Sequence, residues 1–130
     1  MARLLPVGLL LMLLAVAGCG GGDPTAVQGL VAPEEFERAV AEPRTVAINV
    51  HTPDEGSIEG TDLAIPFDRL EARKEELPAT STRLAVYCRS GSMSAEAVRT
   101  LARLGYRDVV ELEGGMIAWE RSGRPLLPSR

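Results

Sequence analysis

Short apolar stretches alternate with helical patterns along most of the chain, and this alternation restricts the fold more than any other feature. Residues 45–50 are almost continuously apolar, which is typical of a strand covered on both faces, and residues 83–88 and 109–112 also have strand patterns. The connections between them are long enough to hold helices. Such an order indicates βαβ units, in which crossover helices join parallel strands. We therefore predict an α/β fold with a mainly parallel sheet and helices on both of its faces.

Weaker patterns predict the remaining elements. Residues 29–31 predict a short edge strand, and residues 63–65 predict a brief strand that Pro66 closes. Pro125 and Pro128 predict a loose tail. Helical patterns with apolar residues on one face cover four segments, residues 33–41, 67–77, 92–104 and 116–122.

The first residues of the chain have the pattern of an export signal. Arg3 supplies a positive charge, and residues 9–16 are apolar but too short to span a bilayer comfortably. Small residues follow. The run Val16-Ala17-Gly18-Cys19 resembles the lipobox of bacterial lipoproteins, whose cysteine is acylated and becomes the first residue. Cys19 is therefore the predicted lipidation site.

This interpretation divides the chain into three parts. Residues 1–18 are expected to be a lipoprotein-type signal peptide, residues 19–28 the acylation site and a flexible tether, and residues 29–127 a single domain. The lipid would anchor the protein to a membrane on the extracytoplasmic side, in the periplasm or at the cell surface. An ordinary cleaved secretory signal is the alternative, and it would give a secreted protein.

The cysteine count directs attention to Cys88. The chain has two cysteines, and a lipid on Cys19 leaves Cys88 without a disulfide partner. Outside the cytoplasm an unpaired thiol is a liability unless it has a function. Cys88 is therefore the candidate reactive residue, with an inert cysteine of the core as the alternative.

Cys88 ends one predicted strand and precedes a predicted helix. Backbone N–H groups at such a junction, together with the positive end of the helix, favour a thiolate, which is the nucleophilic form of cysteine. The loop therefore predicts chemistry at one sulfur atom. The candidate substrate-binding residues are the small and polar residues that follow, Arg89, Ser90, Gly91, Ser92, Met93 and Ser94.

Several motifs occur in the order and spacing of a known family. They are Ile48-Asn49-Val50-His51-Thr52-Pro53-Asp54-Glu55, Gly56-Ser57-Ile58-Glu59-Gly60-Thr61, Ile65-Pro66, Val86-Tyr87-Cys88-Arg89-Ser90-Gly91, Leu104-Gly105-Tyr106 and Leu112-Glu113-Gly114-Gly115-Met116-Ile117-Ala118-Trp119. In these motifs the chain resembles a single-domain rhodanese. The resemblance implies a three-layer α/β/α sandwich with a five-stranded, mainly parallel sheet. It also implies sulfurtransferase activity without a metal or an organic cofactor.

On this resemblance, Cys88 is the catalytic residue and carries sulfane sulfur as a persulfide. The implied donor is thiosulfate or a polysulfide, and the implied acceptor is a thiol, cyanide or a protein. Arg89 would aid the binding of an anionic donor. The expected partners are thus a small sulfur-containing substrate, a protein acceptor and the membrane. A net charge of −4 without a basic cluster argues against nucleic acid.

The chain departs from the family pattern at four positions. Asn49 and His51 replace the usual aspartate and arginine, and Ser57 replaces a common histidine. Met93 ends the loop, where a basic or hydroxyl residue is common. Each change removes charge or polarity near the thiol, which weakens the expectation of thiosulfate as the donor. Met93 would favour neutral or polysulfide donors, or a protein partner, if it lies on the rim, and it only packs if it turns inward.

Other functions fit parts of the pattern. The main alternative is a non-catalytic rhodanese-like module that binds a ligand or senses redox state. A soft-metal site formed by Cys88, Met93 and His51 would suit copper. Cysteine-based phosphatases need an arginine six positions after the cysteine, and this chain has Ser94 there, which argues against phosphatase activity.

Overall fold

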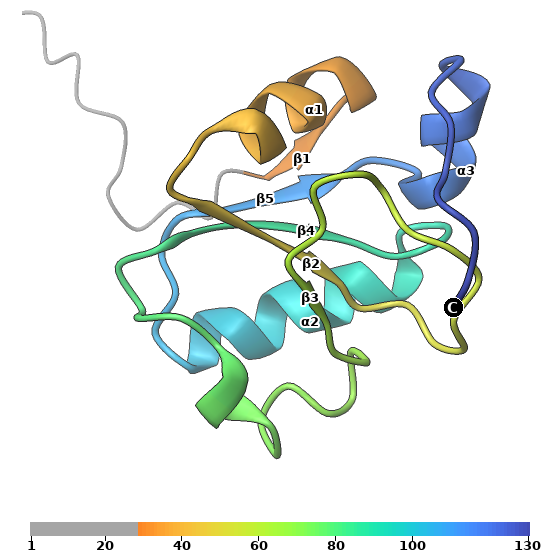
Figure 1. The fold of residues 1–130 in the computed structure, drawn as a ribbon. Helices are drawn as coiled ribbons and strands as arrows, with labels where there is room; N and C mark the ends of the chain where they lie inside the picture. The colour runs from red at the N-terminus through yellow and green to blue at the C-terminus, as the bar shows by residue number, and fades with distance from the viewer. Residues whose placement is uncertain (1–28) are drawn as a thin grey trace, which may run out of the picture.

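The fold is a single parallel sheet with helices on both faces. It is seen in a computed structural model that describes residues 29–130, so the predicted signal peptide, Cys19 and the tether lie outside the described residues. The strands run in the order β1-β5-β4-β2-β3, and every neighbouring pair is parallel (Figure 1). Their bounds are Leu30–Val31 for β1, Thr45–Asn49 for β2, Leu63–Ala64 for β3, Arg83–Tyr87 for β4 and Val109–Leu112 for β5.

Helices form the two outer layers. α1 (Pro33–Ala41) and α3 (Gly115–Arg121) lie on one face of the sheet, and α2 (Ser92–Arg103) lies on the other (Figure 1). We call these the α1 face and the α2 face. Successive residues of β4 alternate between them, so Tyr87 joins the core of the α1 face and Val86 that of the α2 face. The predicted three-layer α/β/α sandwich is confirmed.

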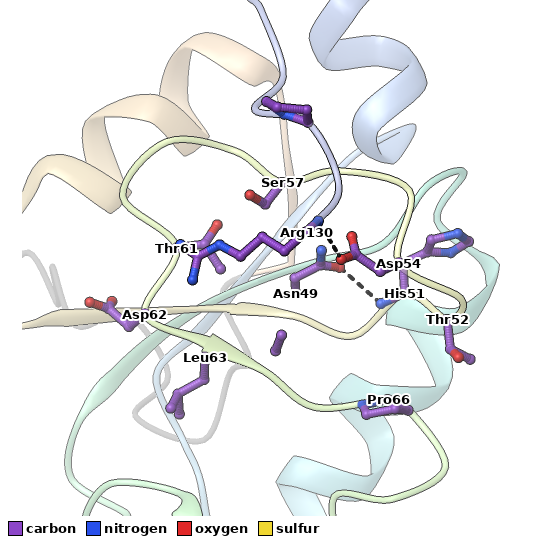
Figure 2. Close-up of a pocket in the computed structure, with 12 residues that line it drawn as sticks. Asn49, His51, Thr52, Asp54, Ser57, Thr61, Asp62, Leu63, Pro66 and Arg130 are labelled. Atoms are coloured by element: carbon purple, nitrogen blue, oxygen red, sulfur yellow. Dashed lines mark hydrogen bonds between the residues drawn. The ribbon is translucent and has the colours of Figure 1, made fainter.

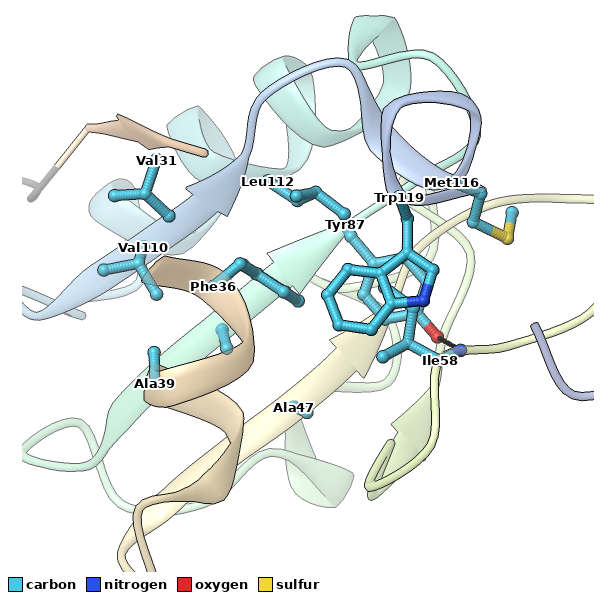
Figure 3. Packing of buried hydrophobic residues seen from close by; sticks show 11 residues of the cluster. Val31, Phe36, Ala39, Ala47, Ile58, Tyr87, Val110, Leu112, Met116 and Trp119 are labelled. Carbon is cyan, nitrogen blue, oxygen red and sulfur yellow. Dashed lines mark hydrogen bonds between the residues drawn. The ribbon is translucent and has the colours of Figure 1, made fainter. Parts of the chain in front are cut away.

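The core of the α1 face is built around aromatic rings. Phe36 packs edge-to-face on Tyr87 and on Trp119, with ring centroids 5.9 Å and 6.4 Å apart (Figure 3). The polar groups of Tyr87 and Trp119 are also hydrogen-bonded. The Ile58 N–H donates to the Tyr87 hydroxyl at 2.9 Å, and the Trp119 indole N–H donates to the Pro125 carbonyl at 3.0 Å. This face therefore combines large buried rings with satisfied polar groups.

The core of the α2 face is mainly aliphatic. Cys88 belongs to it, and Met93 packs against it. Tyr106 is the aromatic ring that is buried there. The aliphatic members are Ile48, Val50, Ile65, Leu70, Leu84, Val86, Ala97, Leu101 and Val109.

The helix predicted over residues 67–77 is wrong. The segment consists of turns followed by one short 3₁₀ helix, η1 (Lys74–Glu76). Leu70 is its one fully buried residue, while Phe67 and Leu77 are half-buried and pack against the core of the α2 face. Glu71 and Glu75 would also stand one helical turn apart with the same charge, which destabilises a helix. The apolar residues of this segment therefore reach the core through turns rather than through an α-helix.

The predicted loose tail is also wrong. Ser57 and Leu127 form an antiparallel bridge, in which the N–H of each donates to the carbonyl of the other at 3.0 Å and 2.8 Å. Further along, the Arg130 N–H donates to the Asp54 carboxylate at 3.1 Å. The tail is held because its main-chain groups find partners in the loop that follows β2.

Candidate active site

Cys88 follows β4 directly and lies at the carboxyl edge of the sheet. The residue is only 1% exposed. Gly91 then adopts a φ of +109°, which glycine tolerates and other residues avoid, and it caps the N-terminus of α2. This turn places the Gly91 N–H 3.0 Å from the Cys88 Sγ, to which it donates a hydrogen bond. The thiol is thus held by a backbone donor at the start of a helix.

The residues that follow Cys88 in the loop 88–94, here called the thiol loop, differ in their surroundings. Arg89, Ser90 and Ser92 are exposed, whereas Ser94 is fully buried. Met93 is half-buried and packs against the core of the α2 face, which is the packing role left open by the sequence. The sequence predicted a cradle of several N–H groups. Among the described residues, Gly91 is the one whose N–H bonds to the sulfur.

The start of α3 supports the thiol loop from the other side. A Cβ on Gly115 would lie 2.4 Å from the Cys88 carbonyl oxygen, so only glycine fits there. The next two N–H groups of α3, those of Met116 and Ile117, donate to the carbonyls of Cys88 and Arg89 at 2.9 Å and 3.0 Å. Two helices therefore hold the loop, with α2 next to the thiol and α3 along the backbone.

Buried polar groups continue inward from the thiol. The Cys88 Sγ lies 3.4 Å from the Ser94 Oγ, and the Ser94 hydroxyl donates to the Glu111 carboxylate at 2.7 Å. Burial raises the pKa of the Glu111 carboxyl, and the hydrogen bond from Ser94 and the charge of Arg99 offset part of that rise. A titratable acid therefore lies one hydroxyl away from the sulfur.

Sequence reasoning missed Glu111. It assigned residues 109–112 to a strand of a sheet with helices on both faces but gave the carboxylate within that strand no role. A charged side chain in such a strand must be buried, and buried carboxylates need partners. That conflict was a usable signal, although the identity of the partner depends on how α2 packs on β5.

Glu55 links two loops at the rim of the site. Its carboxylate lies 2.5 Å from the His51 Nε2 and 3.8 Å from the Arg89 guanidinium. The side chains of Arg89 and Glu55 are both largely exposed, so their ion pair contributes little to stability. The contact nevertheless shows that His51 and Arg89 lie at the same rim, as expected from their positions after β2 and β4.

A cavity of about 410 Å³ opens on the His51 side of this rim (Figure 2). Asn49, His51 and Ser57, three of the positions that depart from the pattern noted above, all line it, whereas Cys88 does not. The Asn49 amide donates to the Gly56 carbonyl at 3.1 Å and accepts the His51 N–H at 3.0 Å. Because an aspartate could not donate to that carbonyl, the asparagine is suited to fixing the loop.

Two further findings concern the described part of the chain. Within residues 29–130, no cluster of three or more histidine, cysteine, aspartate or glutamate side chains is arranged to hold a metal ion. None of the helices described is long and apolar enough to cross a membrane.

Known sequences match this chain through the rhodanese-like domain and a sulfurtransferase. The sequence model of the rhodanese-like domain matches residues 32–122. A sulfurtransferase from Allochromatium vinosum is 38% identical over 65 residues, which make up 50% of this chain and 60% of the relative. The match thus covers less than two thirds of that relative's length.

Solved structures are similar in fold. A rhodanese-related protein from Thermoplasma volcanium superposes with a TM-score of 0.63 at 26% identity, over 75% of this chain and 95% of that one. An NAD-dependent persulfide reductase from A. fulgidus superposes with a TM-score of 0.53 at 35% identity, over 59% of this chain and 14% of that one.

Proposed function

The chain belongs to the rhodanese-like domain family, and we propose that it is a sulfurtransferase that accepts sulfane sulfur on Cys88 and passes it to a second nucleophile. One observation carries this proposal. The Cys88 sulfur accepts a hydrogen bond from the Gly91 N–H at the N-terminus of α2, and such an environment stabilises an anion on sulfur. The proposed donor is thiosulfate or a polysulfide, and the proposed acceptor is a thiol, cyanide or a protein.

The proposed reaction has two displacement steps at sulfur. The Cys88 thiolate attacks the outer sulfur of the donor, whose S–S bond breaks, and the electron pair leaves with sulfite or with the shortened polysulfide. The new outer sulfur is anionic and lies within reach of the N–H groups of the thiol loop. An acceptor nucleophile then attacks this sulfur, and Cys88 leaves as a thiolate.

The charges at the rim bear on the choice of donor. Arg89 is exposed and can contact an anionic donor, but the Glu55 carboxylate lies 3.8 Å from its guanidinium. Glu55 therefore competes for Arg89 and repels a dianion more strongly than a monoanion. We therefore expect a neutral or singly charged sulfane donor to load Cys88 faster than thiosulfate, which is a dianion.

Intact mass spectrometry tests the proposal. Protein beginning at Gly20 is incubated with thiosulfate and, separately, with a polysulfide, beside a Cys88→Ser variant. We expect the gain of one sulfur atom in the unaltered protein and none in the variant. Turnover with cyanide then separates an enzyme from a carrier. If neither donor adds sulfur to folded protein, the non-catalytic module becomes the better interpretation.

We propose in addition that a lipid on Cys19 anchors the protein on the extracytoplasmic side of a membrane. The support is the resemblance of residues 16–19 to a lipobox. Expression of the full chain in a bacterium should give processed protein in the membrane fraction, and Cys19→Ser should leave an unprocessed precursor. Cys88→Ser is the matched control, since it changes the other cysteine. A Cys19→Ser protein that is cleaved and released would indicate an ordinary secretory signal.

A further inference from the structure

Three buried groups form a continuous path from the thiol into the protein. The Cys88 Sγ lies 3.4 Å from the Ser94 Oγ, which lies 2.7 Å from the Glu111 Oε1. Their residues are 1%, 0% and 7% exposed. A hydroxyl can accept a hydrogen bond on one side while it donates one on the other. Ser94 can therefore relay a proton between the other two groups.

The surroundings of Glu111 leave it with few other partners. Its register neighbours in the sheet, Leu30 of β1 and Val86 of β4, carry no charge. From α2, Ser94 donates to it and the charge of Arg99 acts on it. The titratable or charged groups that we identify facing this carboxyl are thus the Cys88 thiol and Arg99.

We propose that Cys88 and Glu111 share one proton through the Ser94 hydroxyl, and that Glu111 stores the proton of the thiol while Cys88 carries sulfur. This inference rests on the proposed role of Cys88 as the sulfur-loading thiol. Glu111 is a positioning residue in this scheme, because it acts on the sulfur only through Ser94. A thiolate and a carboxylate joined through one buried hydroxyl repel each other, which favours the state in which the pair keeps one proton.

The hydrogen bonds are satisfied in both protonation states. In the thiol state, the S–H donates to Ser94 and the Ser94 hydroxyl donates to the carboxylate. In the thiolate state both directions reverse, so that the carboxyl O–H donates to Ser94 and Ser94 donates to the sulfur anion. The Gly91 N–H donates to the sulfur in either state. The proton can therefore move without leaving a buried donor or acceptor unpaired.

The proton balance of the reaction follows from this scheme. During loading, the thiol proton passes to Ser94 while the Ser94 proton passes to Glu111, and the thiolate attacks the sulfane donor. The S–S bond of the donor breaks with its electron pair on the leaving group, and a persulfide anion forms on Cys88. When an acceptor removes the outer sulfur, Cys88 leaves with its electron pair and Glu111 returns the proton. The protein gains and loses no proton over the cycle.

Alkylation of Cys88 by iodoacetamide, followed across about pH 4 to pH 10, tests the inference because this reagent reports the thiolate. We expect the rate to rise in two steps with a plateau between them, since a coupled pair releases its protons separately. Glu111→Gln should remove the plateau and leave one step. Ser94→Ala should lower the plateau about tenfold, because the hydrogen bond to the thiolate is lost. Glu113→Gln, the same change at an exposed carboxylate, should have no effect.

Circular dichroism shows whether each variant is folded. A single step in the unaltered protein overturns the inference, as does an unchanged profile in folded Glu111→Gln or folded Ser94→Ala. The assay uses no sulfur donor, so its outcome is independent of whether Cys88 loads sulfur. Failure of the shared proton and failure of the proposed function can thus be distinguished.

Discussion

Tyr87 and Cys88 are adjacent in the chain, yet they belong to opposite faces of the sheet and to different kinds of core. On the α1 face, the Tyr87 ring packs on Phe36, and its hydroxyl accepts a main-chain N–H (Figure 3). On the α2 face, Cys88 lies among aliphatic side chains and contacts the buried hydroxyl of Ser94. The alternation along this stretch of chain therefore places two adjacent buried polar groups on opposite faces of the sheet.

The difference lies in the partners of the polar groups. A hydroxyl bonded to a main-chain N–H has a partner that cannot titrate, so it only fixes structure. A thiol linked through a hydroxyl to a carboxyl has a partner that can change its charge, and this makes proton movement feasible. Burial alone thus does not separate a structural group from a chemical one in this protein. What separates them is whether the hydrogen-bonded partner of the group can itself gain or lose a proton.

The largest effect is expected where the α1 face touches the thiol loop. Gly115→Ala would force a Cβ against the Cys88 carbonyl at 2.4 Å, at a residue whose φ is +58°. We expect urea denaturation to show a loss of about 3 kcal/mol in the free energy of unfolding. Sulfur loading should be lost as well, because the loop must shift.

Gly123→Ala is the matched control for this change. Gly123 also has a positive φ, +85°, but a Cβ there meets nothing within 4 Å. It should cost only the backbone strain, about 1 kcal/mol, and leave loading intact. Equal effects of the two changes would contradict the view that α3 supports the thiol loop by close contact.

A smaller effect is expected from Tyr87→Phe, which tests whether the α1 face influences the thiol on the α2 face. The change removes the acceptor of the Ile58 N–H and the partner of the Thr61 hydroxyl, 2.7 Å away. Leaving that N–H unpaired should lower the free energy of unfolding by about 2 kcal/mol. The alkylation profile of Cys88 should not change. A changed profile would show that the two faces are coupled.

The smallest effect concerns the dependence of stability on pH. Burial raises the pKa of Glu111 above the value of 4.5 that applies to an exposed glutamate. Well below pH 4.5 the carboxyl is protonated whether the chain is folded or unfolded, so it has no effect on the pH dependence. As pH rises from there through the folded pKa, the folded state holds the proton more tightly, and the free energy of unfolding falls. Glu111→Gln, neutral throughout, should lack this fall.

Urea denaturation at a series of pH values checks the expectation, with Glu113→Gln as the control that should follow the unaltered protein. Parallel curves for Glu111→Gln and the unaltered protein would mean that the carboxyl does not titrate differently on folding.

The parts of the fold that follow from local pattern could be predicted from the sequence. The mostly apolar patterns of β4 and β5 identified both as strands, and the proline and acidic residues of α1 matched its observed start. The position of Cys88 at the strand end followed from the same pattern. These features depend on neighbouring residues, which the sequence displays directly.

The features that depend on distant contacts were missed. Residues 67–77 have a helical pattern but form turns and a short 3₁₀ helix, and the tail is held through a bridge between Ser57 and Leu127. The link from Cys88 to Glu111 requires α2 to place Ser94 between two strands. Neither the register nor the helix position can be read from composition or spacing.

The contact between α3 and the thiol loop has a consequence for how the protein is made. Gly115 and the two N–H donors after it follow Cys88 in the sequence, so they leave the ribosome later. A chain under synthesis therefore carries the cysteine before it carries the residues that shape the backbone around it. The backbone around the cysteine is thus fixed only after nearly the whole domain has emerged.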